Sequence, residues 1–274
     1  MSKLPLVSVV VPAFNAGRLI AGCLQSVVQQ DYQPLEVIVV DGASRDETRD
    51  VMAEFMANHT HIRYVSEPDK GVYDAINKGI RLAQGEWLYV LGCDDRLAHP
   101  HALSELAPLL ASDAELVHAK VLRKSTGLTE GRTDVGSEIV LRNICQQAIL
   151  YRRTLFQRLG DFNLKYPICA DWDFNIRCFA LPCRAAHSDT LLCHYDGGGL
   201  SSRVTDEVFY ADRLDIALRA YLLPLTHARF RPLRYMFHDQ AQLYRRQGAP
   251  IKALRFQLSY LYHAVCARWE AVGR

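Results

Sequence analysis

Residues 6–15 read LVSVVVPAFN, and residues 35–46 read LEVIVVDGASRD. In both stretches a run of Val, Ile and Leu with a single polar interruption leads into a turn that carries an Asn or an Asp. Runs this apolar are typical of parallel strands, because helices cover both faces of a parallel sheet and leave neither face to water. The pattern predicts two central strands, Leu6–Val11 and Leu35–Val40.

The residues that follow extend the same alternation. Two further apolar runs predict strands at Ile62–Val65 and Trp87–Leu91. Between the runs, apolar side chains recur every three to four residues, as on the buried face of a helix, over residues 19–28, 51–56 and 72–83. This order of strands and helices predicts an α/β fold with a doubly wound, mostly parallel, Rossmann-like sheet.

The second half of the chain is less regular. We expect a hairpin of Leu116–Leu122 with the segment around Thr126–Arg132, a strand at Gln147–Tyr151, and a short helix at Trp172–Phe179 that Asp171 opens. Three more helices, separated by Pro and Gly, are predicted at Leu214–Leu223, Leu233–Tyr244 and Ile251–Val265. The chain therefore divides into a main domain over residues 1–205 and a helical extension over residues 206–274.

Length and composition exclude several classes of protein. The 274 residues suit one large α/β domain with an extension, at roughly 150 residues per domain. Hydrophobic residues make up 49% and charged residues 23% of the chain, unlike disordered or low-complexity sequences. No apolar run approaches the roughly 18 residues of a membrane-spanning helix, and no leader segment is recognisable. None of the eight cysteines stands in a C-x-x-C pair, so we expect reduced thiols in a cytoplasmic protein.

Positive charge is concentrated at the C-terminal end. Residues 207–274 hold eleven Lys and Arg against five Asp and Glu, a net charge of +6 that leaves −4 on residues 1–206. Two interpretations fit this basic extension. It forms a peripheral contact with anionic lipid or a lipid-linked substrate at the inner face of the cytoplasmic membrane, or its helices pack on the main domain or on a second copy in a homodimer. No reader motif accompanies the charge, so we expect no nucleic-acid partner.

Polar side chains follow three of the predicted strands at the point where each ends. Asn15 follows the first strand, Asp41 the second, and Asp94 with Asp95 the fourth. In doubly wound sheets, ligands bind at the carboxyl ends of the strands. Asn and Asp side chains hydrogen-bond nucleobase edges and ribose hydroxyls, and adjacent carboxylates suit Mg²⁺ or Mn²⁺ that carries a diphosphate. Each residue alone also fits a helix cap or a solvated turn, but together at one edge they favour a nucleotide site.

Four segments resemble, in order, the motifs of glycosyltransferase family 2: SVVVPAFN at 8–15, EVIVVDGASRD at 36–46, EPDKGVYDAINKG at 67–79 and GEWLYVLGCDD at 85–95. The resemblance extends from residue 6 to about residue 200. It implies a GT-A fold, a nucleotide-sugar donor, a divalent metal ion (Mn²⁺ or Mg²⁺) and transfer with inversion. It also implies a nucleotide-binding half over about residues 1–95 and an acceptor half over about residues 96–205.

The resemblance also carries the family's donor site onto this chain. The positions that hold the base and ribose of the sugar donor correspond to Pro12, Ala13, Asn15 and Asp41. Lys70 stands where a cation approaches the donor diphosphate, or it only decorates a helix start. Gln147 lies in a stretch that resembles the strand lining the donor sugar and the acceptor. Ile76 replaces the Arg of the family's A-R-N-x-G stretch, which argues against a phosphate contact there.

The family's acidic motif, usually D-x-D, carries Gly92 at its first position. The resemblance makes Asp94 the main metal ligand, while Asp95 either assists or only shapes the turn. His194 either adds a ligand to the metal ion or the diphosphate, as in some GT-A enzymes, or is a structural side chain. The glycines that follow at residues 197–199 predict a flexible loop that orders over bound donor.

Inverting transfer needs a carboxylate that deprotonates the acceptor hydroxyl as this hydroxyl attacks the anomeric carbon. Because the metal ion lies on the other side of the sugar, we expect the base in the second half of the chain. The stretch ADWD at 170–173 resembles the family's E-D-x-D at a helix start, with Ala170 in place of Glu, and makes Asp171 the base. A plain N-cap role for Asp171 stays open, Asp173 is expected to orient it, and Trp172 either stacks on a sugar or packs.

The processive members of the family carry a Q-x-x-R-W motif and membrane spans, and this sequence has neither. We therefore predict a transferase that adds one sugar to a glycan or to a polyprenyl-linked saccharide acceptor in cell-surface polysaccharide biosynthesis. A non-catalytic nucleotide-sugar binding protein is one alternative, which Gly92 favours and Asp171 opposes, since a binding protein needs no base. A sugar nucleotidyltransferase is another, but residues 12–17, PAFNAG, are not the glycine-rich phosphate loop with a basic residue that it requires.

Overall fold

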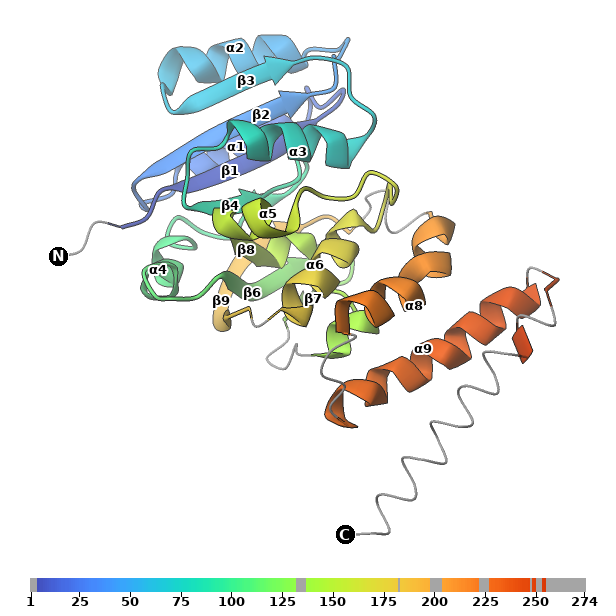
Figure 1. The fold of residues 1–274 in the computed structure, drawn as a ribbon. Helices are drawn as coiled ribbons and strands as arrows, with labels where there is room; N and C mark the ends of the chain where they lie inside the picture. Colours follow the sequence, from blue (N-terminus) through green and yellow to red (C-terminus); the bar gives the residue numbers. More distant parts are fainter. Residues whose placement is uncertain are drawn as a thin grey trace.

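The computed structural model describes residues 4–131, 137–181, 183–197, 204–221, 227–246, 248–249 and 253–254. The strands form one nine-stranded sheet in the order β3-β2-β1-β4-β8-β6-β9-β5, with β7 paired to β6 (Figure 1). The strands are β1 (Val7–Ala13), β2 (Leu35–Asp41), β3 (Ile62–Ser66), β4 (Trp87–Val90), β5 (Arg96–Leu97), β6 (Leu116–Arg123), β7 (Leu128–Glu130), β8 (Ile149–Arg152) and β9 (Ala185–Tyr195).

Helices alternate with these strands in the first half of the chain and gather at its end (Figure 1). The α-helices are α1 (Ile20–Val28), α2 (Thr48–Asn58), α3 (Val72–Leu82), α4 (Ala107–Leu110), α5 (Arg153–Leu159), α6 (Ala170–Ala180), α8 (Glu207–Tyr221) and α9 (His227–Arg246). The short 3₁₀ helices are η1 (Ser104–Leu106), η2 (Ser137–Val140) and η3 (Gln146–Ala148).

The first four strands pair in parallel, which confirms the predicted arrangement of the N-terminal half. Every residue of β1 is buried, and helix α3 lies directly on β1 and β2. Gly79 on α3 permits this approach, because a Cβ there would collide with a methyl group of Val10. The register pairs Ala13 with Asp41 and Asp41 with Ser66, so β1, β2 and β3 end level at one edge of the sheet.

Strand β1 runs two residues past its predicted end at Val11, through a proline. Proline is rare in central strands because it has no N–H to donate to the ladder. Here the pairing of β1 with β4 stops at Val10 and Val90, so Pro12 has a strand neighbour only on the β2 side. The strand therefore continues to Ala13 and carries the backbone of Pro12 and Ala13 to the edge where the predicted site lies.

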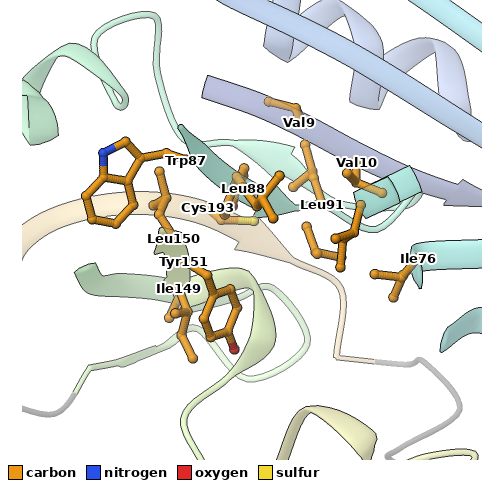
Figure 2. Close-up of a cluster of buried hydrophobic side chains, with 14 of the residues drawn as sticks. Val9, Val10, Ile76, Trp87, Leu88, Leu91, Ile149, Leu150, Tyr151 and Cys193 are labelled. Carbon is orange, nitrogen blue, oxygen red and sulfur yellow. The ribbon is translucent and has the colours of Figure 1, made fainter. Parts of the chain in front are cut away.

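The second half of the sheet is mixed. Strand β8 runs antiparallel to both β4 and β6, while β9 runs parallel to β6. The predicted hairpin is confirmed as the β6–β7 pair, but the strand expected from Gln147 begins only at Ile149, since Gln146–Ala148 form a 3₁₀ turn. Figure 2 shows the core at the junction, where Leu88 of β4, Leu150 of β8 and Cys193 of β9 lie together.

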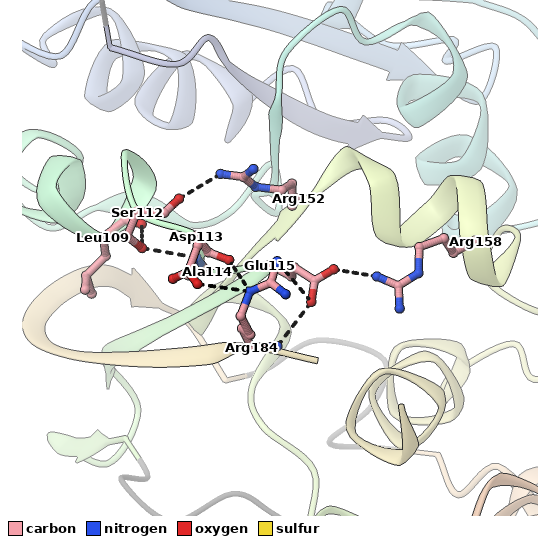
Figure 3. Close-up of polar contacts among 8 residues, drawn as sticks. All are labelled: Leu109, Ser112, Asp113, Ala114, Glu115, Arg152, Arg158 and Arg184. Carbon is pink, nitrogen blue, oxygen red and sulfur yellow. Dashed lines mark hydrogen bonds and ion pairs between the residues drawn. The ribbon is translucent and has the colours of Figure 1, made fainter. Parts of the chain in front are cut away.

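A buried acidic side chain anchors the opposite edge of the sheet (Figure 3). The Glu115 carboxylate, just before β6, pairs with the guanidinium of Arg158 on α5 and accepts the backbone N–H of Arg184 at 3.2 Å. Arg152 at the end of β8 donates to the carbonyl of Ser112 at 3.0 Å. A buried carboxylate is costly unless it is paired, so these contacts are retained. They hold the start of β6, the end of β8 and the start of β9 in one arrangement.

Helix α8 packs on α6, and α9 packs on α8. Arg213 of α8 lies 5.4 Å from the ring centroid of Trp172 on α6 and pairs with Asp239 of α9 at 3.0 Å. The described start of the basic extension therefore covers the main domain, in line with the packing interpretation. The predicted helix at 251–265 lies outside the described residues except for Ala253–Leu254.

The described residues also bear on membrane spans and on the cysteines. Within them, no helix has both the length and the apolar composition that crossing a bilayer requires. The seven described cysteines are free thiols, and burial raises the pKa of most of them, which makes them poor nucleophiles. Cys266 lies outside the described residues.

Candidate functional site

The loops after β1 and β2 are tied together through Asn15. The backbone N–H of Asn15 donates to Ser44 Oγ at 2.7 Å, and Asn15 Oδ1 accepts the backbone N–H of Arg45 at 3.0 Å. Its φ of 49° lies in the left-handed region that Asn tolerates better than most residues. Helix α1 begins only after Leu19, so Asn15 is not its cap. Asn15 is exposed and shapes the edge at which β1 and β2 end.

Asp41, the last residue of β2, is a buried carboxylate with several hydrogen-bond donors. It accepts the hydroxyls of Tyr64 at 2.9 Å and Ser66 at 2.7 Å, and both the N–H and the hydroxyl of Ser44. Burial raises its pKa, but the donors outweigh burial and leave the pKa below the usual aspartate value. Asp41 is therefore ionised at neutral pH. Sequence reasoning missed Tyr64 and Ser66, although both lie on β3 opposite the end of β2.

Pro12 and Ala13 lie buried at the end of β1, where the Ala13 carbonyl accepts the N–H of Gly42 at 2.9 Å. A Cβ at Gly42 would lie 2.5 Å from Asp69 Oδ2, so the loop before α3 lies against the end of β2. The neighbouring Phe14 leaves 66% of its surface exposed at this edge. The sequence analysis did not single out Phe14. Its position, between the end of β1 and Asn15, could have identified it.

Lys70 lies exposed in the loop between β3 and α3. Its backbone N–H donates to Asp74 Oδ2 at 3.0 Å, and the next backbone N–H, that of Gly71, donates to Asp69 Oδ1 at 2.8 Å. These bonds hold the loop at the start of α3, with the φ of 118° that glycine allows at residue 71. The Lys70 ammonium therefore extends from an ordered loop close to the end of β2.

The acidic turn after β4 explains why Gly92 is needed. A Cβ at Gly92 would lie 2.5 Å from Asp95 Oδ2 and 2.9 Å from Asp94 Oδ1. The two carboxylates thus occupy the space into which a first acidic side chain of the motif would grow. The turn therefore holds the Asp94 and Asp95 side chains in these positions only because residue 92 has no side chain.

Asp95 is the buried member of the acidic pair. Its Oδ2 accepts Gln147 Nε2 at 2.7 Å, and its Oδ1 accepts the backbone N–H of Asp196 at 3.2 Å. Burial, and next the neighbouring Asp94 carboxylate, raise the pKa of Asp95 to about 6. The contact with Asp95 also shows what Gln147 does in this structure: it fixes the acidic turn.

The residues at this turn fit a divalent cation whose coordination the ligand completes. Asp94 is half-buried, and no hydrogen bond or ion pair to another described residue engages its carboxylate. Among the described residues, no three His, Cys, Asp or Glu side chains gather closely enough to hold a metal ion by themselves. The free oxygens of Asp94 lie next to the negatively charged side chain of Asp95. Such oxygens are suitable hard ligands for Mg²⁺ or Mn²⁺ that also binds substrate phosphates.

His194 lies on β9, one residue before the end of that strand. Burial, and next the positive charge of Lys124, lower the pKa of its ring. The imidazole is therefore neutral at pH 7 and keeps a lone pair for a ligand. The strand end that carries His194 reaches the acidic turn, because Asp196 donates its N–H to Asp95. Of the three glycines predicted to form a loop, only Gly197 lies within the described residues.

Asp171 lies in the first turn of α6, whose cap position is Cys169. Its side chain does not cap the helix but accepts two hydrogen bonds, from Tyr73 of α3 and from Asn143, both at 2.8 Å. Only 7% of the residue is exposed. Burial raises the pKa of the carboxyl more than the two donors lower it, so the pKa lies above the usual aspartate value. Asp171 therefore does not occupy the N-cap position of α6, although backbone N–H groups of the first turn, at Asp171 and Trp172, also lower the pKa of its carboxyl.

The neighbours of Asp171 on α6 have structural roles. Trp172 donates its Nε1–H to the Ile139 carbonyl at 2.6 Å, and its ring centroid lies 5.1 Å from that of Phe209. This buried ring packs and does not present a face to a ligand. Asp173 pairs with Arg177 at 2.9 Å, one helical turn away, and so does not orient Asp171 as the sequence suggested.

One short segment connects Asp171, the predicted base, with Asp95 of the predicted metal site. Asn143 donates to Asp171, and Gln147 donates to Asp95, only four residues further along the chain. Four residues of extended backbone span at most about 14 Å. One short segment therefore contacts both carboxylates and ties the acidic turn to the start of α6.

A separate pocket of about 360 Å³ lies away from these residues. Its lining includes Leu6, just before β1, Glu86, just before β4, and Arg153 at the start of α5. These positions mark the amino ends of the strands, whereas Asp41 and Asp94 follow the carboxyl ends. The pocket gathers no catalytic constellation and does not belong to the site described above.

Comparison with known proteins gives consistent matches. The family model "Glycosyl transferase family 2" matches residues 8–180. A PGL/p-HBAD biosynthesis glycosyltransferase of Mycobacterium bovis is 38% identical over 211 residues, which cover 75% of this chain and 82% of the relative. Glycosyltransferase GlyG of Streptococcus pneumoniae is 25% identical over 258 residues, or 93% of this chain and 75% of that protein.

Solved structures share the fold at low sequence identity. S. aureus TarS in complex with UDP-GlcNAc superimposes with a TM-score of 0.67 at 17% identity, over 93% of this chain and 91% of that chain. The mannosyltransferase PcManGT from Pyrobaculum calidifontis, in complex with GDP-Man and Mn²⁺, superimposes with a TM-score of 0.65 at 20% identity, over 99% of this chain and 81% of that chain. These similarities confirm the GT-A fold.

Proposed function

This chain belongs to glycosyl transferase family 2, and from that membership we propose that it transfers one sugar, with inversion, from a nucleotide-diphosphate donor to a saccharide acceptor. In this proposal the edge formed by β1, β2 and β4 binds the donor, and the start of α6 supplies the base. Dehydrogenases and nucleotidyltransferases bind phosphates with a glycine-rich loop after the first strand. The described loop after β1 carries Asn15 and no such glycine-rich sequence, which argues against both activities.

The donor's nucleoside would be held by the loops after β1 and β2. An ionised Asp41 accepts hydrogen bonds from N–H or O–H groups of the base or ribose, and its lowered pKa keeps it ionised at working pH. The exposed ring of Phe14 offers a flat face against which a base can stack. Lys70, on its ordered loop, offers a positive charge to the diphosphate.

The leaving group would be stabilised at the acidic turn. A bound Mn²⁺ or Mg²⁺ supplies neutralisation of the charge that develops on the departing diphosphate. Asp94 would hold this ion with its free carboxylate, and Asp95, buried beside it, would assist. His194 is carried by β9, whose end contacts Asp95 through the backbone N–H of Asp196. The co-crystallised Mn²⁺ and GDP-Man of the mannosyltransferase support this assignment by analogy of fold.

The chemical step would be a single in-line displacement. The acceptor oxygen forms a bond to the anomeric carbon while the bond from that carbon to the diphosphate oxygen breaks, and its electron pair leaves with the diphosphate. The acceptor's proton passes to a carboxylate oxygen of Asp171. Because the attacking and leaving groups lie on opposite faces of the sugar, the configuration at the anomeric carbon inverts.

One observation carries the proposal: the Asn143–Gln147 segment contacts both Asp171 and Asp95. A base must lie across the sugar from the diphosphate, and this segment donates a hydrogen bond to a buried carboxylate at each of its ends. A protein that only binds nucleotide sugars needs the donor edge but has no use for the raised pKa and two dedicated donors of Asp171.

For the acceptor we propose a lipid-linked saccharide used in cell-surface glycan assembly at the inner face of the cytoplasmic membrane. The mycobacterial relatives are named for PGL/p-HBAD biosynthesis, which supports a glycan-building context. The net charge of +6 on residues 207–274 supports attraction to a membrane with anionic lipids that carries such an acceptor. We expect binding to vesicles with anionic lipid and no binding to neutral vesicles, and equal binding to both would contradict this part.

Thermal unfolding with a panel of donors tests the proposed function. UDP-, GDP- and dTDP-sugars are each added with and without Mn²⁺, to the wild type and to Asp94→Ala. A donor at 100 times its Kd adds about 2.7 kcal/mol to the free energy of unfolding. We expect a metal-dependent rise in Tm with one nucleotide, reduced in Asp94→Ala. A folded protein whose Tm responds to no donor would refute the proposal.

A further inference from the structure

The proposed base ends a buried chain of hydrogen bonds. Tyr151 Oη donates to Asn175 Oδ1 at 2.8 Å, Asn175 Nδ2 donates to Asn143 Oδ1 at 2.9 Å, and Asn143 Nδ2 donates to Asp171 Oδ2 at 2.8 Å. Tyr151 and Asn175 are fully buried. The four residues come from β8, α6 and the segment before η3, so the chain crosses the acceptor half of the domain.

Every donor in this chain points toward Asp171. A flipped amide at Asn143 would set its oxygen against the Asp171 carboxylate, and a flipped Asn175 would set two amide oxygens against each other. The hydroxyl of Tyr151 completes the order by donating to Asn175. This series of hydrogen bonds therefore allows one orientation of the Asn143 amide, in which its nitrogen donates to Asp171 Oδ2.

Tyr73 contacts the other oxygen of the carboxylate in a different way. Its Oη lies 2.8 Å from Asp171 Oδ1 and 3.0 Å from the carbonyl oxygen of Ile168. Two acceptors therefore share one hydroxyl proton. While Asp171 is ionised, Tyr73 donates to it. Once Asp171 carries a proton on Oδ1, that proton can be donated to Tyr73 Oη, and the hydroxyl of Tyr73 turns to the Ile168 carbonyl.

We propose that Tyr73 and Asn143 are positioning residues for Asp171, with Tyr73 as a two-way hydroxyl that keeps the carboxyl hydrogen-bonded before and after it takes the acceptor's proton. Asn143 holds Oδ2 in one direction, and Tyr73 follows the proton on Oδ1. The proton moves only between the acceptor, Asp171 Oδ1 and the bond to Tyr73, so the step needs no further reagent. The catalytic consequence rests on the proposed function, whereas the hydrogen-bonding claim does not.

The Ile168 carbonyl is itself held in place by the C-terminal part of the chain. Asp206, just before α8, accepts the backbone N–H groups of Ile168 at 3.0 Å and Cys169 at 3.1 Å, and that of Phe209 at 3.0 Å. The loop that leads into α6 is thereby tied to the start of α8. The alternative acceptor of Tyr73 therefore has a defined position.

Titration of Asp171 tests the proposal without a substrate. The groups that interact electrostatically with its carboxyl are Tyr73 on α3, Tyr151 on β8, Cys145 and Cys169. We would follow the aspartate side-chain carbons by ¹³C NMR and identify Asp171 by the loss of its signal in Asp171→Asn. Tyr73→Phe and Asn143→Leu each remove a donor to the ionised form, so each is expected to raise the pKa of Asp171 by about 1.

Tyr32→Phe is the matched control. Its buried hydroxyl also donates to a backbone carbonyl, that of Pro5 at 2.7 Å, but before β1 and away from Asp171. It is expected to leave the pKa of Asp171 unchanged. An unchanged pKa in both Tyr73→Phe and Asn143→Leu, or an equal rise in Tyr32→Phe, would overturn the proposal.

A kinetic comparison separates failure of this inference from failure of the proposed function. With a turnover assay of nucleotide release, Tyr73→Phe is expected to lower kcat by about tenfold to a hundredfold at an unchanged donor KM and to move the acidic limb of the pH profile upward. In an Asp171→Asn background the same change is expected to have no further effect. Retained turnover of Asp171→Asn would refute the base assignment alone, whereas an unshifted limb in Tyr73→Phe would refute the positioning role alone.

Discussion

Asp41, at the end of strand β2, and Asp171, in the first turn of helix α6, are both buried aspartates, yet their surroundings shift their pKa values in opposite directions. Asp41 accepts hydrogen bonds from three hydroxyls and a backbone N–H, and its pKa lies below the usual value. Asp171 accepts hydrogen bonds from two side chains, but burial raises its pKa more than its donors lower it, and the pKa lies above the usual value. The difference shows that the number of donors relative to burial decides whether the pKa of a buried carboxylate is lowered or raised.

The largest effect is expected for Asp171→Asn. The amide cannot accept the acceptor's proton, so transfer should fall by about 10²- to 10⁴-fold, while donor binding, measured by calorimetry, stays unchanged. The pKa of Asp171 is raised in the folded protein, so the free energy of unfolding of the wild type should fall, relative to Asp171→Asn, as pH rises above about 4. An active variant, or one no more stable than the wild type at pH 7, would remove Asp171 from the role of a buried base.

The same raised pKa predicts the acidic limb of the wild-type activity. Only the ionised form of Asp171 accepts a proton, so kcat/KM should decrease as pH falls through a value above the aspartate pKa of about 3.9. The pH profile of kcat/KM measures this limb. A profile that stays flat down to pH 4 would contradict the raised pKa of Asp171.

Gly92→Asp should weaken the site, although it recreates the family's acidic motif. A Cβ at this position would lie 2.5 Å from Asp95 Oδ2, so the turn has to shift or the two carboxylates have to separate. Overpacking of this kind costs about 1–3 kcal/mol, so donor binding in the presence of Mn²⁺ should weaken by about fivefold to a hundredfold. Tighter metal-dependent binding in a titration of Gly92→Asp would instead show that the turn has room for a third carboxylate.

A smaller effect is expected for Asp41→Asn, measured as stability against pH. The pKa of Asp41 is lowered in the folded protein, so its contribution to stability is present above about pH 4 and is lost as pH falls through the lowered pKa. Urea unfolding should show the wild type more stable than Asp41→Asn at pH 7, with a difference that narrows toward pH 3. A difference that does not change with pH would mean that the charge on Asp41 contributes nothing.

Much of the N-terminal half was predictable because its strands and the polar residues that follow them are determined by short stretches of sequence. A run of β-branched residues that ends in Asn or Asp determines both a buried strand and the side chain that follows it, as for Val37–Val40 and Asp41. The parallel strands then bring the ends of β1, β2 and β4 to one edge by topology alone. Even here, the three hydroxyls that set the pKa of Asp41 come partly from β3, which no local pattern connects to residue 41.

The acceptor half was less predictable because its contacts join distant parts of the chain. The sequence pointed to Asp171 through resemblance, but Tyr73 lies 98 residues away from it and Asn143 lies 28 residues away. Asp173, expected to orient Asp171, pairs with Arg177 because residues four apart share one face of a helix. Gln147, predicted to contact the donor, lies in a 3₁₀ turn and donates to Asp95, which lies 52 residues away in the sequence.

The order of strands, the edge at which they end and the residue types found there were contained in the sequence, because periodicity and strand-end chemistry act over a few residues. Which donors surround each carboxylate, and therefore whether its pKa is lowered or raised, was decided only by the tertiary structure. Burial and hydrogen bonding set a pKa through groups that are close in space, and the chain brings those groups together from α3, β3, β8 and α6 only when it folds.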